Sequence, residues 1–182
     1  MRSKLIILFL FFSIVEASAS IKEKIVQNLK TTENLTFNFE QNINGKTENG
    51  YCALAYPKKI FCRYNLKNNK ILVSNGKSIV IKTKSSYYLY PLERTPLNLI
   101  LNKNFLVNKI KILNEKIIDD KFINYSFIEN DNEINIFFNK KNYNLVGWQT
   151  VDIYQNLSIT YISGLIKNQI LDQNKFILPN QN

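Results

Sequence analysis

The stretch GYCALAYPKKIFCRYNLKNNKILVSNG, residues 50–76, holds short apolar runs separated by turn residues. The runs are Tyr51–Tyr56, Ile60–Tyr64 and Ile71–Ser74. Pro57 begins the first break, and Asn75-Gly76 follows the last run. Proline presets φ at a turn and cannot donate to a sheet ladder, while Asn-Gly tolerates the positive φ of a hairpin turn. The stretch therefore predicts three or four antiparallel strands joined by tight turns.

The two cysteines of the chain fall within this stretch. Cys52 and Cys62 lie five positions on either side of Pro57, which places them opposite each other across the first hairpin. In an oxidising compartment such a pair can form a disulfide, and closing about ten residues contributes roughly 2–3 kcal/mol in the chain-entropy model. The alternative is a pair of small buried side chains that stay reduced. Two thiols without histidine make a poor zinc site, because zinc takes four ligands.

The first residues have the pattern of a secretory signal peptide. Met1–Lys4 is basic, Leu5–Val15 is an apolar run, and Ala17-Ser18-Ala19 gives the A-x-A pattern for cleavage after the second alanine. The run is shorter than the roughly 20 apolar residues of a membrane span, although an uncleaved anchor is the alternative. We expect residues 1–19 to be a signal peptide and residues 20–182 to form one soluble, exported domain.

The net charge of the chain is strongly positive. Its formal value is +10, and loss of the signal peptide lowers it by one. A basic surface can attract nucleic acid, anionic lipid or an acidic partner. However, the lysines are scattered, and basic clusters interleaved with aromatic residues are absent. We therefore expect no nucleic-acid partner, and we interpret the charge as an aid to solubility with weak steering.

Two stretches have the signature of a helix. Ser20 and Glu23 have the spacing of a capping box, and apolar residues then recur every four positions, which predicts a helix over about residues 21–31. Thr95 can cap a second helix whose first position is proline, and residues 97–101 are almost entirely apolar. The second stretch predicts a short buried helix inserted between strands.

Alternation of apolar and polar residues predicts the other strands, beginning with Leu35, Phe37 and Phe39. The further strands are expected at 47–56, 79–82, 87–90, 109–114, 122–128, 134–138, 145–153, 157–162 and 175–178. Together they predict a mainly β domain with one antiparallel sheet of ten or eleven strands, curled enough to bury one face. Such a sheet either packs its interior solidly or holds a ligand, and the pattern leaves both open.

Catalytic signatures are scarce in this sequence. The chain has no histidine, which removes the usual general base, and it lacks the common nucleophile, nucleotide and metal motifs. The carboxylates considered for an acid–base pair are Glu40, Asp119, Asp120, Asp131, Glu133 and Asp152. Those at 119–120 and 131 stand in polar, loop-like runs, which favours solvated turn residues. We expect no enzyme activity, no cofactor and no bound metal.

Several short motifs follow one another along the chain after the signal peptide. They are F-x-F-x-Q at Phe37–Gln41, a Gly50-led strand ending in Pro57, I-L-V-S-N-G at Ile71–Gly76, Tyr90-Pro91-Leu92 running into Thr95-Pro96-Leu97, Gly147-Trp148 with Asp152, and Lys175-Phe176-x-x-Pro179. Their order and spacing resemble the periplasmic outer-membrane lipoprotein carrier family, LolA, in its alphaproteobacterial branch. The resemblance covers nearly all of the expected mature chain.

The resemblance implies an incomplete, half-open β-barrel of about eleven strands with a helical lid over an apolar cavity. It implies a periplasmic carrier that takes the acyl chains of outer-membrane lipoproteins from an inner-membrane lipoprotein-releasing ABC transporter to an outer-membrane receptor lipoprotein. Burying acyl chains is worth about 0.8 kcal/mol per CH₂, so crossing an aqueous gap needs a soluble escort. We expect a monomer.

Three other functions remain as alternatives. A periplasmic sensor or binding module would use the same fold for a lipid or a lipidated peptide. The acceptor lipoprotein is disfavoured, because no cysteine follows the signal peptide for lipidation. An exported hydrolase is the last alternative.

On this resemblance, the candidate acyl-chain-binding residues come from the sheet and from the lid. The expected sheet lining is Leu35, Phe37, Phe39, Leu54, Tyr56, Ile71 and Val73, and the expected inner face of the lid is Leu97, Ile100 and Leu101. Tyr56 stands where many relatives carry an Arg that helps to hold the lid closed. A phenol can donate a hydrogen bond to a lid carbonyl but has no charge, so the latch is expected to be weaker or built differently, with Arg63 and Arg94 as candidate substitutes.

Overall fold

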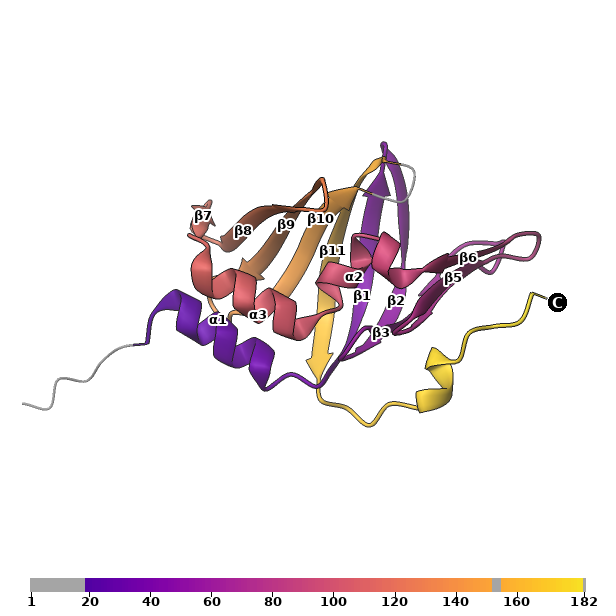
Figure 1. Cartoon of the computed structure of the whole chain (residues 1–182), viewed down its shortest axis with the longest axis horizontal. Helices are drawn as coiled ribbons and strands as arrows, with labels where there is room; N and C mark the ends of the chain where they lie inside the picture. Colours follow the sequence, from indigo (N-terminus) through magenta and orange to yellow (C-terminus); the bar gives the residue numbers. More distant parts are fainter. Residues whose placement is uncertain (1–18, 152–154, 182) are drawn as a thin grey trace, which may run out of the picture.

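The computed structural model describes residues 19–151 and 155–181, and most of the expected signal peptide lies outside the described residues. Its strands are β1 Asn34–Ile43, β2 Lys46–Ala55, β3 Lys59–Tyr64, β4 Ile71–Asn75, β5 Ser78–Lys82, β6 Tyr87–Pro91, β7 Lys116–Ile118, β8 Phe122–Glu129, β9 Asn132–Asn139, β10 Leu145–Val151 and β11 Leu157–Lys167. They form one antiparallel sheet in the order β6-β5-β4-β3-β2-β1-β11-β10-β9-β8-β7 (Figure 1). The strands β6 and β7 are its two free edges, so the predicted open, barrel-like sheet of about eleven strands is confirmed.

The helices are α1 Ile21–Lys30, α2 Leu97–Ile100 and α3 Lys103–Ile112, with short 3-10 turns η1 Leu92–Arg94 and η2 Gln173–Phe176. The predicted capping box is present, because the Ser20 N–H donates to Glu23 Oε2 over 2.7 Å and the Glu23 N–H donates to Ser20 Oγ over 3.2 Å. Among the described residues, no helix combines the length and the apolar character needed to span a bilayer.

Two expected strands are wrong. Residues 109–114 belong mostly to α3, in which Leu106 and Ile110 are buried one turn apart and the Asn102 side chain accepts from the first turn. Residues 175–178 end η2 and continue as irregular chain. The last residues of the strand expected at 145–153, including the carboxylate candidate Asp152, lie outside the described residues.

One half of the sheet carries a solid core on the face that the helices cover, the concave face. Helices α1 and α3 contact each other and lie over β8–β11 in Figure 1. The largest side chains of this core are Ile25, Leu106, Ile110, Ile123, Tyr125 and Phe138, all fully buried. The rings of Tyr125 and Phe138 meet edge to face at 6.2 Å. The short helix α2 lies in front of β1 and β2 in the same view.

The opposite, convex face is covered in part by the C-terminal segment. The turn η2 contacts β3 and β4, and the Lys82 ammonium donates to the Asn180 carbonyl over 2.6 Å. The buried apolar residues on this side are Ala53, Val73, Val80 and Phe176, which we call the back cluster. Their strand positions follow from the register, in which Val73 pairs with Phe61 and Val80. The chain therefore buries apolar surface on both faces of β2–β5.

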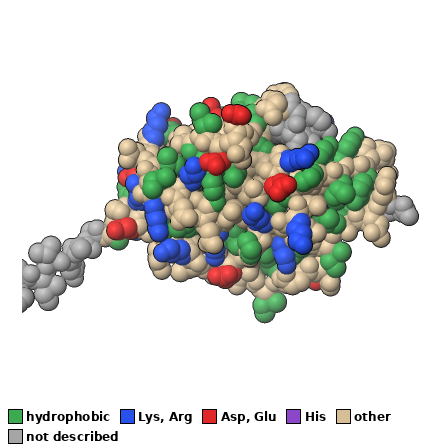
Figure 2. Space-filling model, viewed as in Figure 1, with side chains coloured by type: hydrophobic (Ala, Val, Ile, Leu, Met, Phe, Trp, Pro, Cys, Tyr) green, Lys and Arg blue, Asp and Glu red, His purple; other side chains and the backbone are tan. Residues whose placement is uncertain are grey.

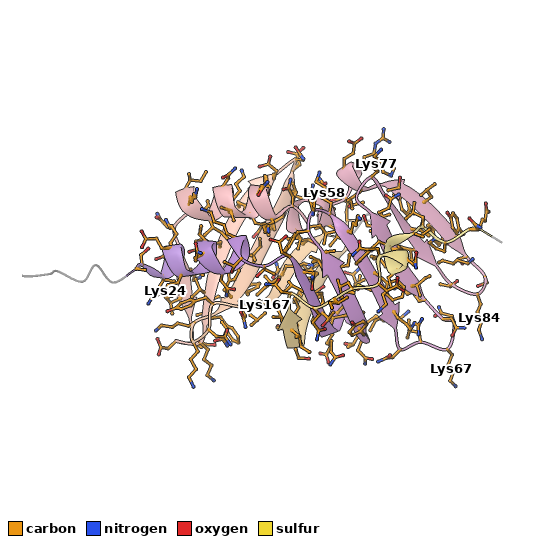
Figure 3. All side chains as sticks on the ribbon, turned by 90° about the horizontal axis from the view of Figure 1, so that it is seen from below. Lys24, Lys58, Lys67, Lys77, Lys84 and Lys167 are labelled. Atoms are coloured by element: carbon orange, nitrogen blue, oxygen red, sulfur yellow. A yellow bond between two sulfur atoms is a disulfide. The ribbon has the colours of Figure 1, made fainter. Side chains whose placement is uncertain are left out.

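The charges are spread over the molecule. Figure 2 shows lysines and arginines distributed across one whole face, with hydrophobic side chains gathered toward β5 and β6. In Figure 3, Lys67 and Lys84 lie at one end of the β3–β6 strands, and Lys58 and Lys77 lie at the other end. This distribution agrees with the scattered pattern in the sequence and forms no single basic stripe on the face shown.

Candidate functional site

A cavity of about 390 Å³ lies between α2 and the concave face of the other half of the sheet. It is lined by residues of β1–β6, of β10 and β11, and of the chain entering α2. Its apolar wall includes Phe39, Ile60, Leu72, Ile79, Leu97 and Trp148. Ligand pockets of about 300–1,000 Å³ are typical of small-molecule sites, so the volume suits a ligand of moderate size.

The register explains why these side chains face one space. Phe39 pairs with Gly50, and Gly50 pairs with Tyr64. A Cβ at Gly50 would come within 2.1 Å of the Arg63 carbonyl oxygen and 2.9 Å of the Phe39 ring. Glycine at this position therefore permits close approach of the strands, and the rings of Phe39 and Tyr64 meet edge to face at 4.9 Å.

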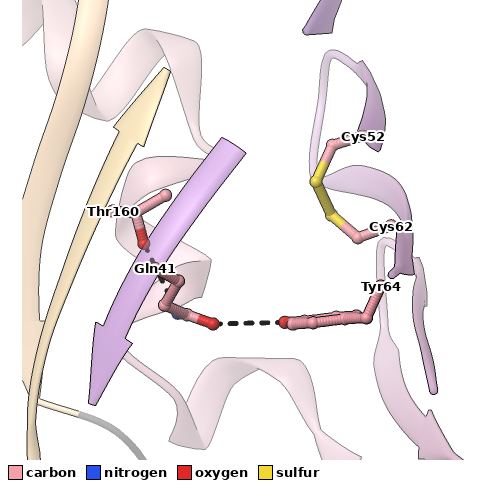
Figure 4. Close-up of a disulfide and its surroundings, with 5 residues drawn as sticks. All are labelled: Gln41, Cys52, Cys62, Tyr64 and Thr160. Carbon is pink, nitrogen blue, oxygen red and sulfur yellow. Dashed lines mark hydrogen bonds between the residues drawn. A yellow bond between two sulfur atoms is a disulfide. The ribbon is translucent and has the colours of Figure 1, made fainter. Parts of the chain in front are cut away.

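The disulfide predicted from the hairpin is present in the cavity wall. Cys52 and Cys62 are directly paired across β2 and β3, their Cα atoms are 4.1 Å apart, and their sulfur atoms are bonded. Both residues are buried and both line the cavity. The bond therefore ties together the two strands that form the middle of the cavity wall (Figure 4).

The expected acyl-binding residues divide into three groups. Phe39 and Leu97 line the cavity. Another set packs in or against the adjoining core without lining the cavity: Leu35, Phe37, Leu54, Tyr56, Ile100 and Leu101. The third group, Ile71 and Val73, was assigned to the wrong face.

The register of β3 and β4 gives the reason for this error. Cys62 on the concave face pairs with Leu72, so Ile71 and Val73 point to the convex side, where Val73 joins the back cluster. Residues 71–73 are all apolar, so the sequence did not show which of them face the cavity, and a one-residue slip in register exchanges the two faces.

A set of polar side chains crosses the concave face beyond Phe39. We call Gln41, Tyr64, Ser158 and Thr160 the polar row; all four line the cavity. Gln41 Nε2 donates to Ser158 Oγ over 2.9 Å. Gln41 Nε2 also donates to Thr160 Oγ1 over 3.4 Å, and the Tyr64 hydroxyl donates to Gln41 Oε1 over 3.3 Å (Figure 4). The only signal in the sequence was polar Gln41 in phase with the apolar alternation of β1.

An ion pair adjoins this row. The Glu48 carboxylate contacts the Lys70 ammonium, which also lies 4.2 Å from the centre of the Tyr64 ring. Burial, and secondarily the negative charge of Glu48, raise the pKa of the Tyr64 hydroxyl well above its ordinary value. Tyr64 therefore stays a neutral hydrogen-bond donor at physiological pH.

The lid is attached through backbone groups and one lysine. The Lys58 N–H, in the β2–β3 turn, donates to the Leu101 carbonyl at the end of α2 over 2.9 Å. The Lys103 ammonium donates to the Thr32 carbonyl over 2.9 Å and lies 5.5 Å from the centre of the Tyr56 ring. The positive charge beside the lid is therefore that of Lys103, the first residue of α3.

The residues suggested for the latch are placed differently. The Tyr56 hydroxyl is buried and has no hydrogen-bond partner in the described part of the chain, and burial raises its pKa far above the ordinary value. Arg63 lies on the convex face with its guanidinium over the Phe61 ring, and Arg94 is exposed at the end of η1. Neither arginine makes the contacts that Lys103 makes with the Thr32 carbonyl and the Tyr56 ring.

The groups that line this site are apolar side chains, hydroxyl and amide groups, and one ion pair between Glu48 and Lys70. In the ranges that the structure describes, no group of three or more His, Cys, Asp or Glu side chains is placed to hold a metal ion. The arrangement is suited to holding a ligand with an apolar body.

Comparison with known families identifies the chain. The family model described as outer membrane lipoprotein carrier protein LolA matches residues 30–178. The chain belongs to the LolA family. The match spans both halves of the sheet and the whole of α2 and α3, includes only the last residue of α1, and ends after η2. It does not bear on the alphaproteobacterial branch, which stays a prediction. A comparison with curated proteins finds no significant match.

Solved structures resemble this LolA family member at low sequence identity. A LolA superfamily protein from Nitrosomonas europaea is 9% identical, with a TM-score of 0.48 over 87% of this chain and 96% of that one. An outer membrane lipoprotein-sorting protein domain from Vibrio parahaemolyticus is 9% identical, with a TM-score of 0.44 over 84% and 94%. The Mycobacterium tuberculosis lipoprotein LppX is 11% identical, with a TM-score of 0.43 over 83% and 96%. Likeness at this level carries no argument about function.

Proposed function

We propose that this chain is a periplasmic carrier that binds the acyl chains of outer-membrane lipoproteins in the cavity under α2. It receives them from an inner-membrane lipoprotein-releasing ABC transporter and passes them to an outer-membrane receptor lipoprotein. The observation that carries the proposal is the cavity itself, with Phe39, Trp148 and Leu97 in its wall, in a chain of the LolA family. Each CH₂ moved from water into this wall contributes about 0.8 kcal/mol.

The route to the periplasm belongs to the same proposal. Residues 1–19 act as a cleaved signal peptide, and the chain from residue 20 works as a monomer that carries one lipoprotein. The cargo's folded part stays outside, and its acyl chains lie between the concave sheet and α2. This role requires no reaction on the cargo.

The test is release of a triacylated lipoprotein from proteoliposomes that contain the matched transporter. The purified mature protein should yield a soluble one-to-one complex, and mass spectrometry should detect the acylated cargo in it. Leu97→Glu should abolish uptake, because an ionised carboxylate resists burial against hydrocarbon by several kcal/mol. Ile112→Glu makes a comparable change on the exposed side of α3 and should leave uptake intact.

The outcomes separate the candidate functions. Release by Leu97→Glu at the wild-type level would remove α2 from the binding site. If the wild type releases no lipoprotein but copurifies with lipid or a lipidated peptide, the periplasmic sensor or binding module replaces the carrier. If it neither releases nor binds acylated molecules, the acyl-binding proposal is wrong.

A further inference from the structure

The polar row interrupts a cavity that is otherwise suited to hydrocarbon. Its members come from β1, β3 and β11, so they form a band across the strands near one end of the sheet. Ser158 is only 4% exposed and Thr160 only 3% exposed, and both line the cavity. Such buried hydroxyls are costly in an apolar environment unless they have hydrogen-bond partners.

The direction of the hydrogen bonds leaves donors available at this band. Gln41 Nε2 has two hydrogens and directs them to Ser158 and Thr160, so both hydroxyl oxygens act as acceptors. Each hydroxyl retains its own hydrogen, and within residues 19–151 and 155–181 neither donates to another protein group. Two buried O–H donors therefore line the cavity, and the ligand group complementary to them is an acceptor.

The charges around the cavity indicate which kind of acceptor. Glu48 and Lys70 are the charged side chains among the described cavity-lining residues, and they pair with each other. The lining therefore offers no uncompensated cation for a carboxylate or a phosphate. A neutral carbonyl oxygen can accept from hydroxyls without bringing a buried charge.

We propose that the polar row is a subsite for the neutral carbonyl groups, ester or amide, that join acyl chains to the cargo. The inference rests on the proposed function and adds a polar contact point to the apolar cavity. The carbonyls accept from Ser158 and Thr160, and the hydrocarbon extends from there along the wall formed by Ile60 and Leu97. The row then fixes how deeply the acyl chains enter.

The experiment compares two synthetic lipids of equal chain length, a diacylglycerol with two ester carbonyls and a dialkylglycerol with ether links. Binding is measured by displacement of a fluorescent fatty-acyl probe from the mature protein. Two neutral hydrogen bonds of about 0.5–1.5 kcal/mol each should make the wild type prefer the ester by about 5- to 140-fold. The double variant Ser158→Ala/Thr160→Val should lose this preference and keep its affinity for the ether.

A matched control makes the same threonine change away from the cavity. Thr36 is buried on the convex side and bonds to Gln169, so Thr36→Val should retain the ester preference. Equal wild-type affinity for the two lipids would overturn the subsite without any variant, as would an ester preference that survives in the double variant. Failure of both lipids to bind would instead count against the acyl cavity and the proposed function.

Discussion

Reduction of the Cys52–Cys62 disulfide is a quantitative test of how much the middle of the cavity wall depends on a covalent link. The two cysteines are 10 residues apart in sequence and already paired by the β2–β3 ladder. Loop-closure entropy for a loop of this length gives about 2.7 kcal/mol at 25 °C. For a domain of this size, each kcal/mol corresponds to roughly 2–4 °C, so the melting temperature should fall by about 5–11 °C.

The assays are equilibrium urea unfolding and thermal melting of the mature protein with and without a thiol reductant, with the redox state verified by mass spectrometry of alkylated samples. The variant Cys52→Ala/Cys62→Ala is the control, because its midpoint should not respond to the reductant. The oxidised protein should show the two residues linked. Equal midpoints for the verified dithiol and disulfide forms would refute the reasoning, because the unfolded chain would then gain nothing from opening the loop.

Two further predictions concern single aromatic residues. Tyr56→Phe removes a buried hydroxyl that has no partner among the described residues, so unfolding free energy should stay constant or rise by about 1 kcal/mol. Since burial raises the pKa of Tyr56, only the unfolded state ionises it above about pH 10, and stability should fall there with rising pH. The variant should show a smaller fall in urea titrations at pH 8 and 10.5, and an unchanged fall would contradict this origin. Phe176→Ala should release the C-terminal segment, because Phe176 is buried in the back cluster and away from the cavity. Hydrogen exchange at residues 171–180 should become faster, and acyl binding should be retained. Unaltered exchange would show that other contacts hold the segment.

Local features of the sequence predicted the parts of the fold that depend on local chemistry. Pro57 indicated the turn of the hairpin, and the equal spacing of Cys52 and Cys62 from it predicted that the two cysteines pair across the strands. The capping box of Ser20 and Glu23 placed the start of α1, because both partners lie within one turn. In each case a short-range steric or hydrogen-bonding rule was sufficient.

Features that depend on distant partners were harder to predict. Residues 103–112 have weak amphipathic character, and their helix is explained by burial of Leu106 and Ile110 against the sheet. The faces of Ile71 and Val73 depended on the register of β4 with β3. The polar row joins Gln41 to residues more than a hundred positions later, and no local rule connects them.

One half of the sheet is packed with side chains and the other half keeps a cavity, so stability and ligand space are provided by different parts of one small domain. The half under α1 and α3 is a solid core, whereas the half under α2 keeps open volume beside a disulfide. Part of the cavity wall, such as Ile43 and Ile81, lies outside the buried core cluster, so substitutions there change few of the contacts that hold the fold together. The volume of the cavity can therefore change at such positions, while Tyr125 and its neighbours maintain the fold.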